Sequence, residues 1–180
     1  MYDWTDDDVN AYATMCRDWT LDPSVLLHVW QSESGLDPTA HCAGGASGLC
    51  QFEPGTLDGL GYNLAGDVHL EAFRELCVAE QLPWVRLYYL HGRPCLGTVA
   101  GAYAWTFLPA QAHLAADPAA TLCAREGPYA VAYRDNRPAF DADNKGHITG
   151  ADLAARAARA WSPRAEGILS RVQAVLSPGA

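Results

Sequence analysis

The chain has 180 residues, of which 49% are hydrophobic and 18% charged. This length and composition predict one folded domain and exclude a largely disordered chain. The 12 Lys and Arg residues stand against 21 Asp and Glu, and the resulting net charge of -9 argues against a nucleic-acid partner, because phosphate binding needs clustered basic side chains. No apolar run approaches the roughly 20 residues needed to cross a bilayer.

The first residues have neither a basic region nor an apolar core. Met1 to Trp4 is followed by acidic residues at 6–8, so we expect no secretory signal peptide. The six cysteines show no metal-binding spacing, and their expected state is reduced, buried thiols rather than disulfides.

Helix start and stop signals dominate the rest of the chain, and strand signals are nearly absent. Asp22-Pro23 and Gly35 predict the two ends of a short helix. The segment from His41 to Gly61 contains six glycines and predicts a shaped loop with short helical turns.

Further helices are expected along the second half of the sequence. One is predicted from Val68 to about Leu82, with a continuation that Pro83 opens, and another over residues 96–107. The Ala-rich tail from residue 151 on predicts a helix that Pro163 interrupts. Its basic residues, Arg156, Arg159 and Arg164, are interpreted as a solvated helix face. The fold class is therefore all-α.

Glu33 continues an apolar stripe on the short helix. Leu26, Val29, Trp30 and Glu33 follow the i, i+3, i+4, i+7 spacing and share one face. Desolvation and the negative end of the helix would both raise the pKa of this carboxyl. A carboxyl protonated near neutral pH is able to donate a proton to a leaving oxygen. The alternative is that Glu33 turns into water where the helix ends.

The residues around Glu33 resemble a known family. Glu33-Ser34-Gly35 is followed by Gly45-Ala-Ser-Gly-Leu-Cys-Gln-Phe52 and then by Pro54-Gly-Thr56. This pattern is similar to that of the soluble lytic transglycosylases and goose-type lysozymes, and the resemblance continues more loosely over about residues 20–160. It implies a lysozyme-like helical domain, expected to span residues 1–180 with a helical tail over 151–178, that acts on peptidoglycan glycan strands.

The resemblance also implies roles for single residues. Glu33 would be the catalytic acid that later acts as base, and Ser34 would orient it or touch the substrate. Tyr103 would hold the carboxyl or the sugar by its hydroxyl. For Tyr103 and Gln51 the alternative is ordinary packing. The residues expected to line the sugar groove are Gly48, Leu49, Gln51 and Phe52.

Two positions depart from the family pattern, because Cys50 replaces a Met and Ala104 replaces an Asn. Phe107-Leu-Pro-Ala110 and Tyr133-x-x-Asn136 are similar to transglycosylase-like domains of phage particles. The expected setting is therefore a phage virion or tail, acting in the host cell wall or periplasm and held by other virion proteins.

Most glycoside hydrolases need two carboxylates. The candidates for a second one are Asp37, Glu53 and Asp58, and none has a motif of its own. The resemblance implies that a transglycosylase needs one Glu, because the 6-hydroxyl of muramic acid closes an anhydro ring from within the substrate. Two alternatives stay open: a goose-type lysozyme that uses water, and a weakly active or inactive wall-binding virion module.

The segment from Asp141 to Asp152 resembles a calcium loop, with candidate ligands Asp141, Asp143, Thr149 and Asp152. Lys145 occupies a place where a ligand should lie. Thr149-x-x-Asp152 alternatively forms a capping box at the start of the last helix. We therefore expect no metal and no other cofactor.

Overall fold

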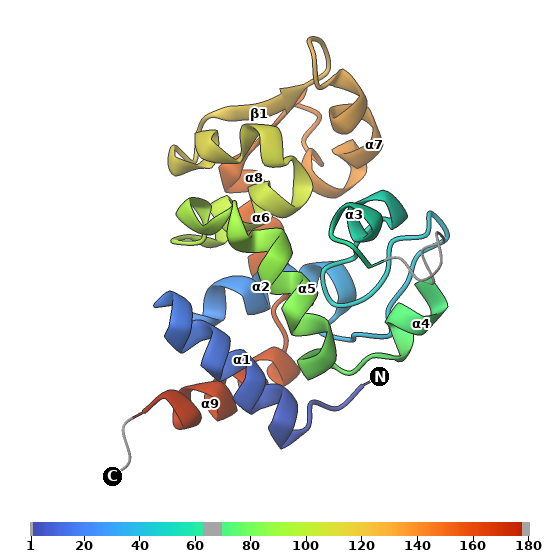
Figure 1. Cartoon of the computed structure of the whole chain (residues 1–180). Coiled ribbons are helices and arrows are strands. Elements are labelled where there is room, and N and C mark those ends of the chain that lie inside the picture. Colours follow the sequence, from blue (N-terminus) through green and yellow to red (C-terminus); the bar gives the residue numbers. More distant parts are fainter. Residues whose placement is uncertain (1, 63–69, 178–180) are drawn as a thin grey trace.

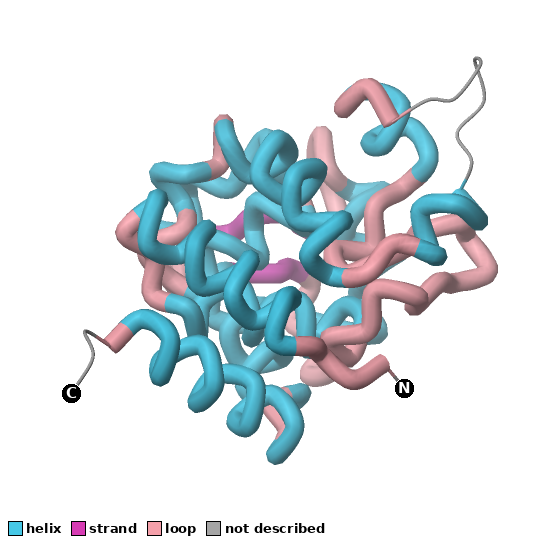
Figure 2. The backbone as a smooth tube through the Cα atoms, turned by 60° about the horizontal axis from the view of Figure 1, so that its bottom comes forward, coloured by secondary structure: helices cyan, strands magenta, loops and turns pink. Residues whose placement is uncertain are grey.

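The computed structural model describes residues 2–62 and 70–177. Helices make up most of this part of the chain, and two short strands lie among them (Figures 1 and 2). The elements in chain order are α1 (Asp6–Trp19), α2 (Pro23–Ser34), α3 (Pro54–Gly59), α4 (Leu70–Glu75), α5 (Val78–Leu90), the 3₁₀-helix η1 (Arg93–Cys95), α6 (Val99–Phe107), the 3₁₀-helix η2 (Pro109–Ala116), β1 (Thr121–Ala124), α7 (Ala130–Phe140), β2 (His147–Thr149), α8 (Gly150–Ala160) and α9 (Pro163–Leu176).

Helix α1 begins at a capping box. Thr5 accepts a hydrogen bond from the backbone N–H of Asp8, and the Asp8 carboxylate accepts one from the N–H of Thr5. Asp8 is fully buried, and its carboxylate also accepts from the backbone N–H of Ala79 at 2.8 Å and from the hydroxyl of Tyr2. The same side chain therefore caps α1 and joins it to the first turn of α5.

The predicted short helix is confirmed as α2. The Asp22 side chain caps it by accepting from the N–H of Ser24, and Gly35 ends it with a left-handed φ of 65°. Leu26 and Trp30 are fully buried in one large apolar cluster, and the ring of Tyr12 from α1 packs on Trp30 at 5.1 Å between centroids. This packing fixes the end of α2 that bears Glu33.

We expected one helix from Val68 to about Leu82 and a break at Pro83, and the position of this break is wrong. Val68 lies outside the described residues, α4 ends at Glu75 and α5 begins at Val78, whereas Pro83 lies inside α5. The Glu80 carboxylate accepts from the N–H of Cys77 and starts α5 before the proline is reached. The helix expected over 96–107 begins later, at Val99, because the Thr98 hydroxyl caps it.

The all-α fold class is confirmed, because the described residues contain only one short pair of strands beside the helices. β1 and β2 pair antiparallel, with a register shift between Thr121 and Cys123. Strands of four and three residues are too short for an alternating pattern to show in the sequence. Leu122 and Ile148 are buried, so the pair supports one side of α7 and α8.

The helical tail is confirmed, and the interruption at Pro163 separates α8 from α9. The interpretation of its arginines is wrong for two of the three. Arg164 donates to the carbonyl oxygens of Tyr2, Gly35 and Leu36, and it thereby holds α9 against the N-terminal segment and the end of α2. Arg156 points into the site described below, and Arg159 alone is exposed.

All six cysteines fall within the described residues and are free thiols. Cys16, Cys50 and Cys123 are buried as expected, but Cys42 is exposed. Cys77 and Cys95 are partly exposed. Among the described residues, no helix has the length and apolar character that a membrane span requires.

Candidate active site

A cleft of about 520 Å³ opens at the C-terminal end of α2. Its walls come from α2, the glycine-rich loop before α3, and the helices α5, α6, α7 and α8. In Figure 1 the loop and α3 lie to the right of α6 and α8, and α7 lies above α3. Glu33 lies in the lining, so the carboxyl at the end of α2 faces the cleft rather than bulk water.

Glu33 occupies the last turn of α2 and is only partly exposed. Burial raises the pKa of its carboxyl above the ordinary value of 4.5, against a hydrogen bond with Tyr103 and the positive charge of Arg156, which both lower it. Burial prevails over these two groups. The carboxyl therefore keeps its proton to a higher pH than a solvated glutamate would.

The hydroxyl of Tyr103 lies at the centre of the polar contacts behind Glu33. Tyr103 comes from α6 and is 1% exposed. Its hydroxyl oxygen accepts from Nε of Arg156 at 3.2 Å and shares a hydrogen bond of 2.9 Å with the hydroxyl of Ser32. These contacts leave the tyrosine hydroxyl fixed from two sides, so Tyr103 is able to hold the Glu33 carboxyl in one orientation.

Aromatic rings form the apolar part of the cleft. The guanidinium of Arg156 lies over the ring of Phe140 at 5.3 Å, and Tyr103 meets the same ring edge-on at 5.5 Å between centroids. Across the cleft, Phe52 and Tyr88 form an edge-to-face pair at 5.2 Å. Phe52, Tyr88 and Phe140 thus line the same cleft as Glu33, whose pKa is raised by burial.

Only two of the four loop residues predicted to line the sugar groove lie in the cleft lining. Gln51 and Phe52 line the cleft, whereas Gly48 and Leu49 are buried behind it and are not part of its lining. Gln51 has a left-handed φ of 50° and its side-chain amide donates to the carbonyls of Ala40 and Gly48. The loop thus presents two of the four residues to a ligand and uses the other two for packing.

Gly48 has a packing reason for being glycine. Its φ is 78°, and a Cβ would lie 2.5 Å from Cε1 of Phe73 and 2.7 Å from Oε1 of Gln81. Gln81, a fully buried residue of α5, accepts from the N–H of Leu49 at 2.9 Å and donates to the carbonyl of Pro38 at 2.8 Å. Sequence reasoning missed Gln81, because a lone glutamine in a helix gives no signal of its own.

Ser34 does not reach the cleft lining. Its hydroxyl donates to the carbonyl of Leu49 at 2.8 Å and to that of Trp30 at 3.0 Å. Ser34 therefore joins the glycine-rich loop to the end of α2, and it fixes the distance between the loop and Glu33.

Of the three candidates for a second carboxylate, Glu53 alone lies in the described lining of the cleft. Glu53 is exposed, so its surroundings differ from those of Glu33. Asp37 accepts hydrogen bonds from Thr39 and from the N–H of Tyr2 and stabilises a turn. Asp58 is an exposed residue of α3 outside the lining.

Of the two departures from the family pattern, Cys50 lies in the cleft lining and Ala104 does not. Ala104 is fully buried, and Cys50 is buried at the cleft wall, where burial raises the pKa of its thiol well above the ordinary value. Arg156 was missed by sequence reasoning. The sequence shows Arg156 only as one basic residue of an Ala-rich helix, and this pattern does not indicate a place in the cleft.

The calcium-like loop is occupied by the protein's own groups. Lys145 forms an ion pair with Asp152, and the capping box of Thr149 and Asp152 at the start of α8 is confirmed. The Asp141 carboxylate accepts from the hydroxyl of Tyr133 and from the N–H groups of Lys145 and Gly146. Within the described residues, no group of three His, Cys, Asp or Glu side chains is placed to hold a metal ion.

Residues 12–72, about a third of the chain, match the family described as Transglycosylase SLT domain. This segment contains the second half of α1, then α2, the glycine-rich loop and α3, and thus Glu33, whereas Tyr103 and Arg156 lie outside it. No curated protein matches the chain, and no solved structure does.

Proposed function

We propose that this chain, which matches the transglycosylase SLT domain over residues 12–72, is a peptidoglycan lytic transglycosylase that cleaves the β-1,4 bond between N-acetylmuramic acid and N-acetylglucosamine with Glu33 as its one catalytic carboxyl. The observation that carries the proposal is the environment of Glu33. A carboxyl in an apolar cleft, with a raised pKa and a fixed tyrosine hydroxyl beside it, has the properties of a general acid.

The reaction needs two proton transfers through the one carboxyl of Glu33. Protonated Glu33 donates its proton to the glycosidic oxygen as the bond to C1 of muramic acid breaks. The Glu33 carboxylate then accepts the proton of the 6-hydroxyl, whose oxygen bonds to C1 and closes the 1,6-anhydro ring. Because the nucleophile belongs to the substrate, its effective molarity is very high and a second catalytic carboxylate is not required.

Glu53 supports a second candidate, a hydrolytic lysozyme of the goose type. Its carboxylate lies in the cleft lining and is exposed, where a base could activate water. The two candidates differ in their products, because a transglycosylase releases 1,6-anhydro ends and a hydrolase releases reducing ends.

We further propose a setting in a phage virion or tail. The support is the similarity of residues 107–110 and 133–136 to domains of phage particles, together with the net charge of -9. A diffusing enzyme gains from electrostatic attraction to an anionic wall, whereas a particle that carries the enzyme to its substrate makes such steering unnecessary.

The test uses purified cell wall with the native chain, Glu33→Gln and Glu53→Gln. Mass spectrometry of the released muropeptides is expected to show 1,6-anhydro ends for the native chain and for Glu53→Gln. Glu33→Gln is expected to lose at least about a hundredfold in rate. Reducing ends that disappear in Glu53→Gln would favour the hydrolase. Equal, measurable rates for the native chain and Glu33→Gln would overturn the role of Glu33, and no release by the native chain would favour a wall-binding module without catalysis.

A further inference from the structure

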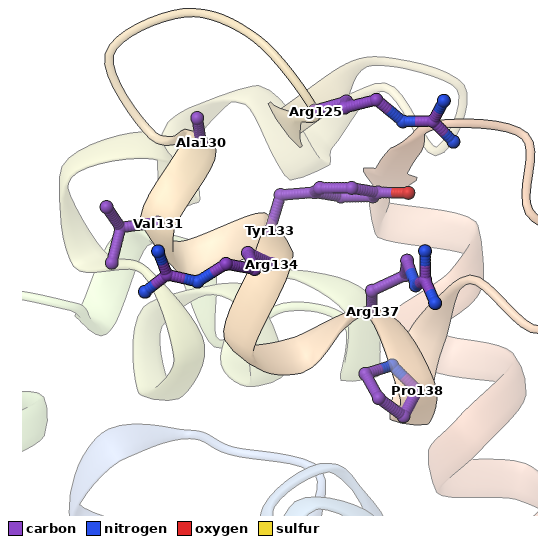
Figure 3. Close-up of a pocket in the computed structure, with 7 residues that line it drawn as sticks. All are labelled: Arg125, Ala130, Val131, Tyr133, Arg134, Arg137 and Pro138. Carbon is purple, nitrogen blue, oxygen red and sulfur yellow. The ribbon is translucent and has the colours of Figure 1, made fainter.

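A second hollow, of about 560 Å³, lies against α7 and the end of β1. Its lining includes Arg125, Arg134 and Arg137 and contains no carboxylate (Figure 3). The chain has 12 basic residues against 21 acidic ones, so three arginines in one lining are a local reversal of its charge. We call this site the arginine hollow.

Two of the three guanidinium groups are not neutralised by the protein. Among the residues that the structure describes, neither Arg125 nor Arg137 has a carboxylate within ion-pair distance, and Arg125 donates to the neutral amide oxygen of Asn144 at 3.1 Å. Arg134 does have a partner, the neighbouring Asp135. In Figure 3, Arg125 and Arg137 extend toward the hydroxyl end of Tyr133, and Arg134 extends the other way, past Val131.

The floor of the arginine hollow is apolar. In Figure 3 the buried ring of Tyr133 lies between Arg125 on one side and Arg134 and Arg137 on the other, and Val131 and Pro138 contribute exposed aliphatic surface. The hydroxyl of Tyr133 is engaged with the buried carboxylate of Asp141 at 2.7 Å, and that carboxylate also accepts two backbone N–H groups. The groups left to bind a ligand are therefore two guanidinium forks, one on each side of the Tyr133 ring, and the aliphatic side chains of the same lining. This combination fits a carboxylate on an aliphatic stem better than a bare inorganic anion.

Helix α7 separates the arginine hollow from the cleft. Asn136 and Phe140, one turn apart, line the cleft, whereas Tyr133 and Arg137, also one turn apart, line the hollow. The two sites thus lie on adjacent sides of one helix, whose diameter with side chains is about 10–12 Å. A peptide of three or four extended residues spans that distance, at about 3.3 Å per residue.

We propose that the arginine hollow binds the carboxylates of the acidic peptide that a peptidoglycan strand carries, while the glycan lies in the cleft. The inference rests on the proposed function, because the cleft must hold the sugar to which the peptide is attached. Arg125 and Arg137 supply the bidentate contacts, and the exposed Val131 and Pro138 pack against the peptide's aliphatic groups.

The test compares two substrates made from the same wall: glycan strands with their peptides, and strands from which an amidase has removed them. The variants are Arg125→Gln/Arg137→Gln and Arg125→Lys/Arg137→Lys, with Arg159→Gln as the matched control at an exposed arginine of α8. The measured quantity is the ratio of kcat/KM on peptide-bearing strands to kcat/KM on bare strands.

For the double glutamine variant we expect this ratio to fall about tenfold through KM, the size expected for charged hydrogen bonds at a partly exposed site. The double lysine variant is expected to recover part of the loss, since it keeps the charge without the fork. Arg159→Gln is expected to keep the native ratio. An unchanged ratio in the double glutamine variant, or an equal loss on both substrates, would overturn the inference.

Failure of the proposed function is distinguished by Glu33→Gln. If that variant cleaves both substrates like the native chain, the proposed chemistry fails, and the hollow is then judged by calorimetric titration of the native chain with the free tetrapeptide of the wall. Binding that Arg125→Gln/Arg137→Gln abolishes would support the hollow, and no binding to the native chain would overturn it. Competition by inorganic phosphate as strong as by the tetrapeptide would also overturn the assignment to a peptide.

Discussion

Arg156 donates a hydrogen bond from Nε to the hydroxyl oxygen of Tyr103 at 3.2 Å. The same guanidinium lies over the ring of Phe140 and faces the cleft, and its positive charge lowers the pKa of Glu33. One side chain therefore fixes the tyrosine beside the carboxyl and adjusts the proton affinity of that carboxyl. Arg156 is a positioning residue by this geometry.

Replacing Arg156 with Gln is expected to raise the pKa of Glu33, because the charge that opposes burial is removed. An acid catalyst is active below its pKa, so the alkaline limb of the pH–rate profile should move to higher pH. Loss of the contact to Tyr103 should also lower kcat roughly ten- to a hundredfold. The measurement is muropeptide release across the pH range.

Arg156→Lys is the control, since it keeps the charge and loses the planar guanidinium. We expect this variant to retain the native alkaline limb while its kcat falls. A lower rate with no shift of the limb in Arg156→Gln would mean that Arg156 serves packing alone.

The buried carboxyl of Glu33 is expected to limit stability at neutral pH. Its pKa is raised above 4.5 in the folded state, so the folded chain binds more protons than the unfolded one between 4.5 and the raised pKa. The free energy of unfolding therefore falls as pH rises through this window. Glu33→Gln removes this pH-dependent loss of unfolding free energy. Each kcal/mol of unfolding free energy gained in this way should raise Tm by about 2–4 °C.

Thermal melts of Glu33→Gln and the native chain at a series of pH values test this directly. The two Tm values are expected to converge below pH 4.5, where the native carboxyl is protonated in both states, and to separate as pH rises. A difference that is constant with pH would show that lost packing, rather than titration, causes it.

The sequence allowed the end of α2 that bears Glu33 to be predicted because its signals are local. Asp22-Pro23, the apolar stripe and Gly35 all lie within one helix, and they determine both its ends and the face that bears Glu33. Gln51 and Phe52 follow in a motif whose spacing is also local. These features need no knowledge of which distant segments pack together.

Arg156 and Gln81 could not be predicted in the same way. Each lies on a helix whose own pattern is compatible with exposure or burial. The partner of Arg156 is decided by the packing of α8 against α2 and α6, and that of Gln81 by the packing of α5 against the glycine-rich loop. The long apolar stem of an arginine also allows its charge to reach a cleft from a helix that looks solvated. The short strands β1 and β2 depend on pairing across α7, which a sequence pattern does not record.

Gly48→Ala is expected to destabilise the fold by about 3 kcal/mol. The new Cβ would meet Phe73 and Gln81 at under 3 Å, and an L side chain is strained at a φ of 78°. Gly55→Ala is the matched control, because nothing lies within 4 Å of its Cβ position and its φ is not left-handed. It should change the free energy of unfolding by no more than about 0.5 kcal/mol. Urea unfolding measures both, and similar values for the two variants would contradict the packing argument.

Asp152→Ala is expected to destabilise the chain independently of calcium. The Asp152 carboxylate accepts from the N–H and hydroxyl of Thr149 and forms an ion pair with Lys145, so its loss should cost about 1 kcal/mol of capping energy. Calcium or a chelator should leave the Tm of the native chain unchanged, since the ammonium of Lys145 lies where a cation would have to bind. Melting curves with and without calcium decide the point. A Tm that calcium raises in the native chain and not in Asp152→Ala would show that the loop binds the metal after all.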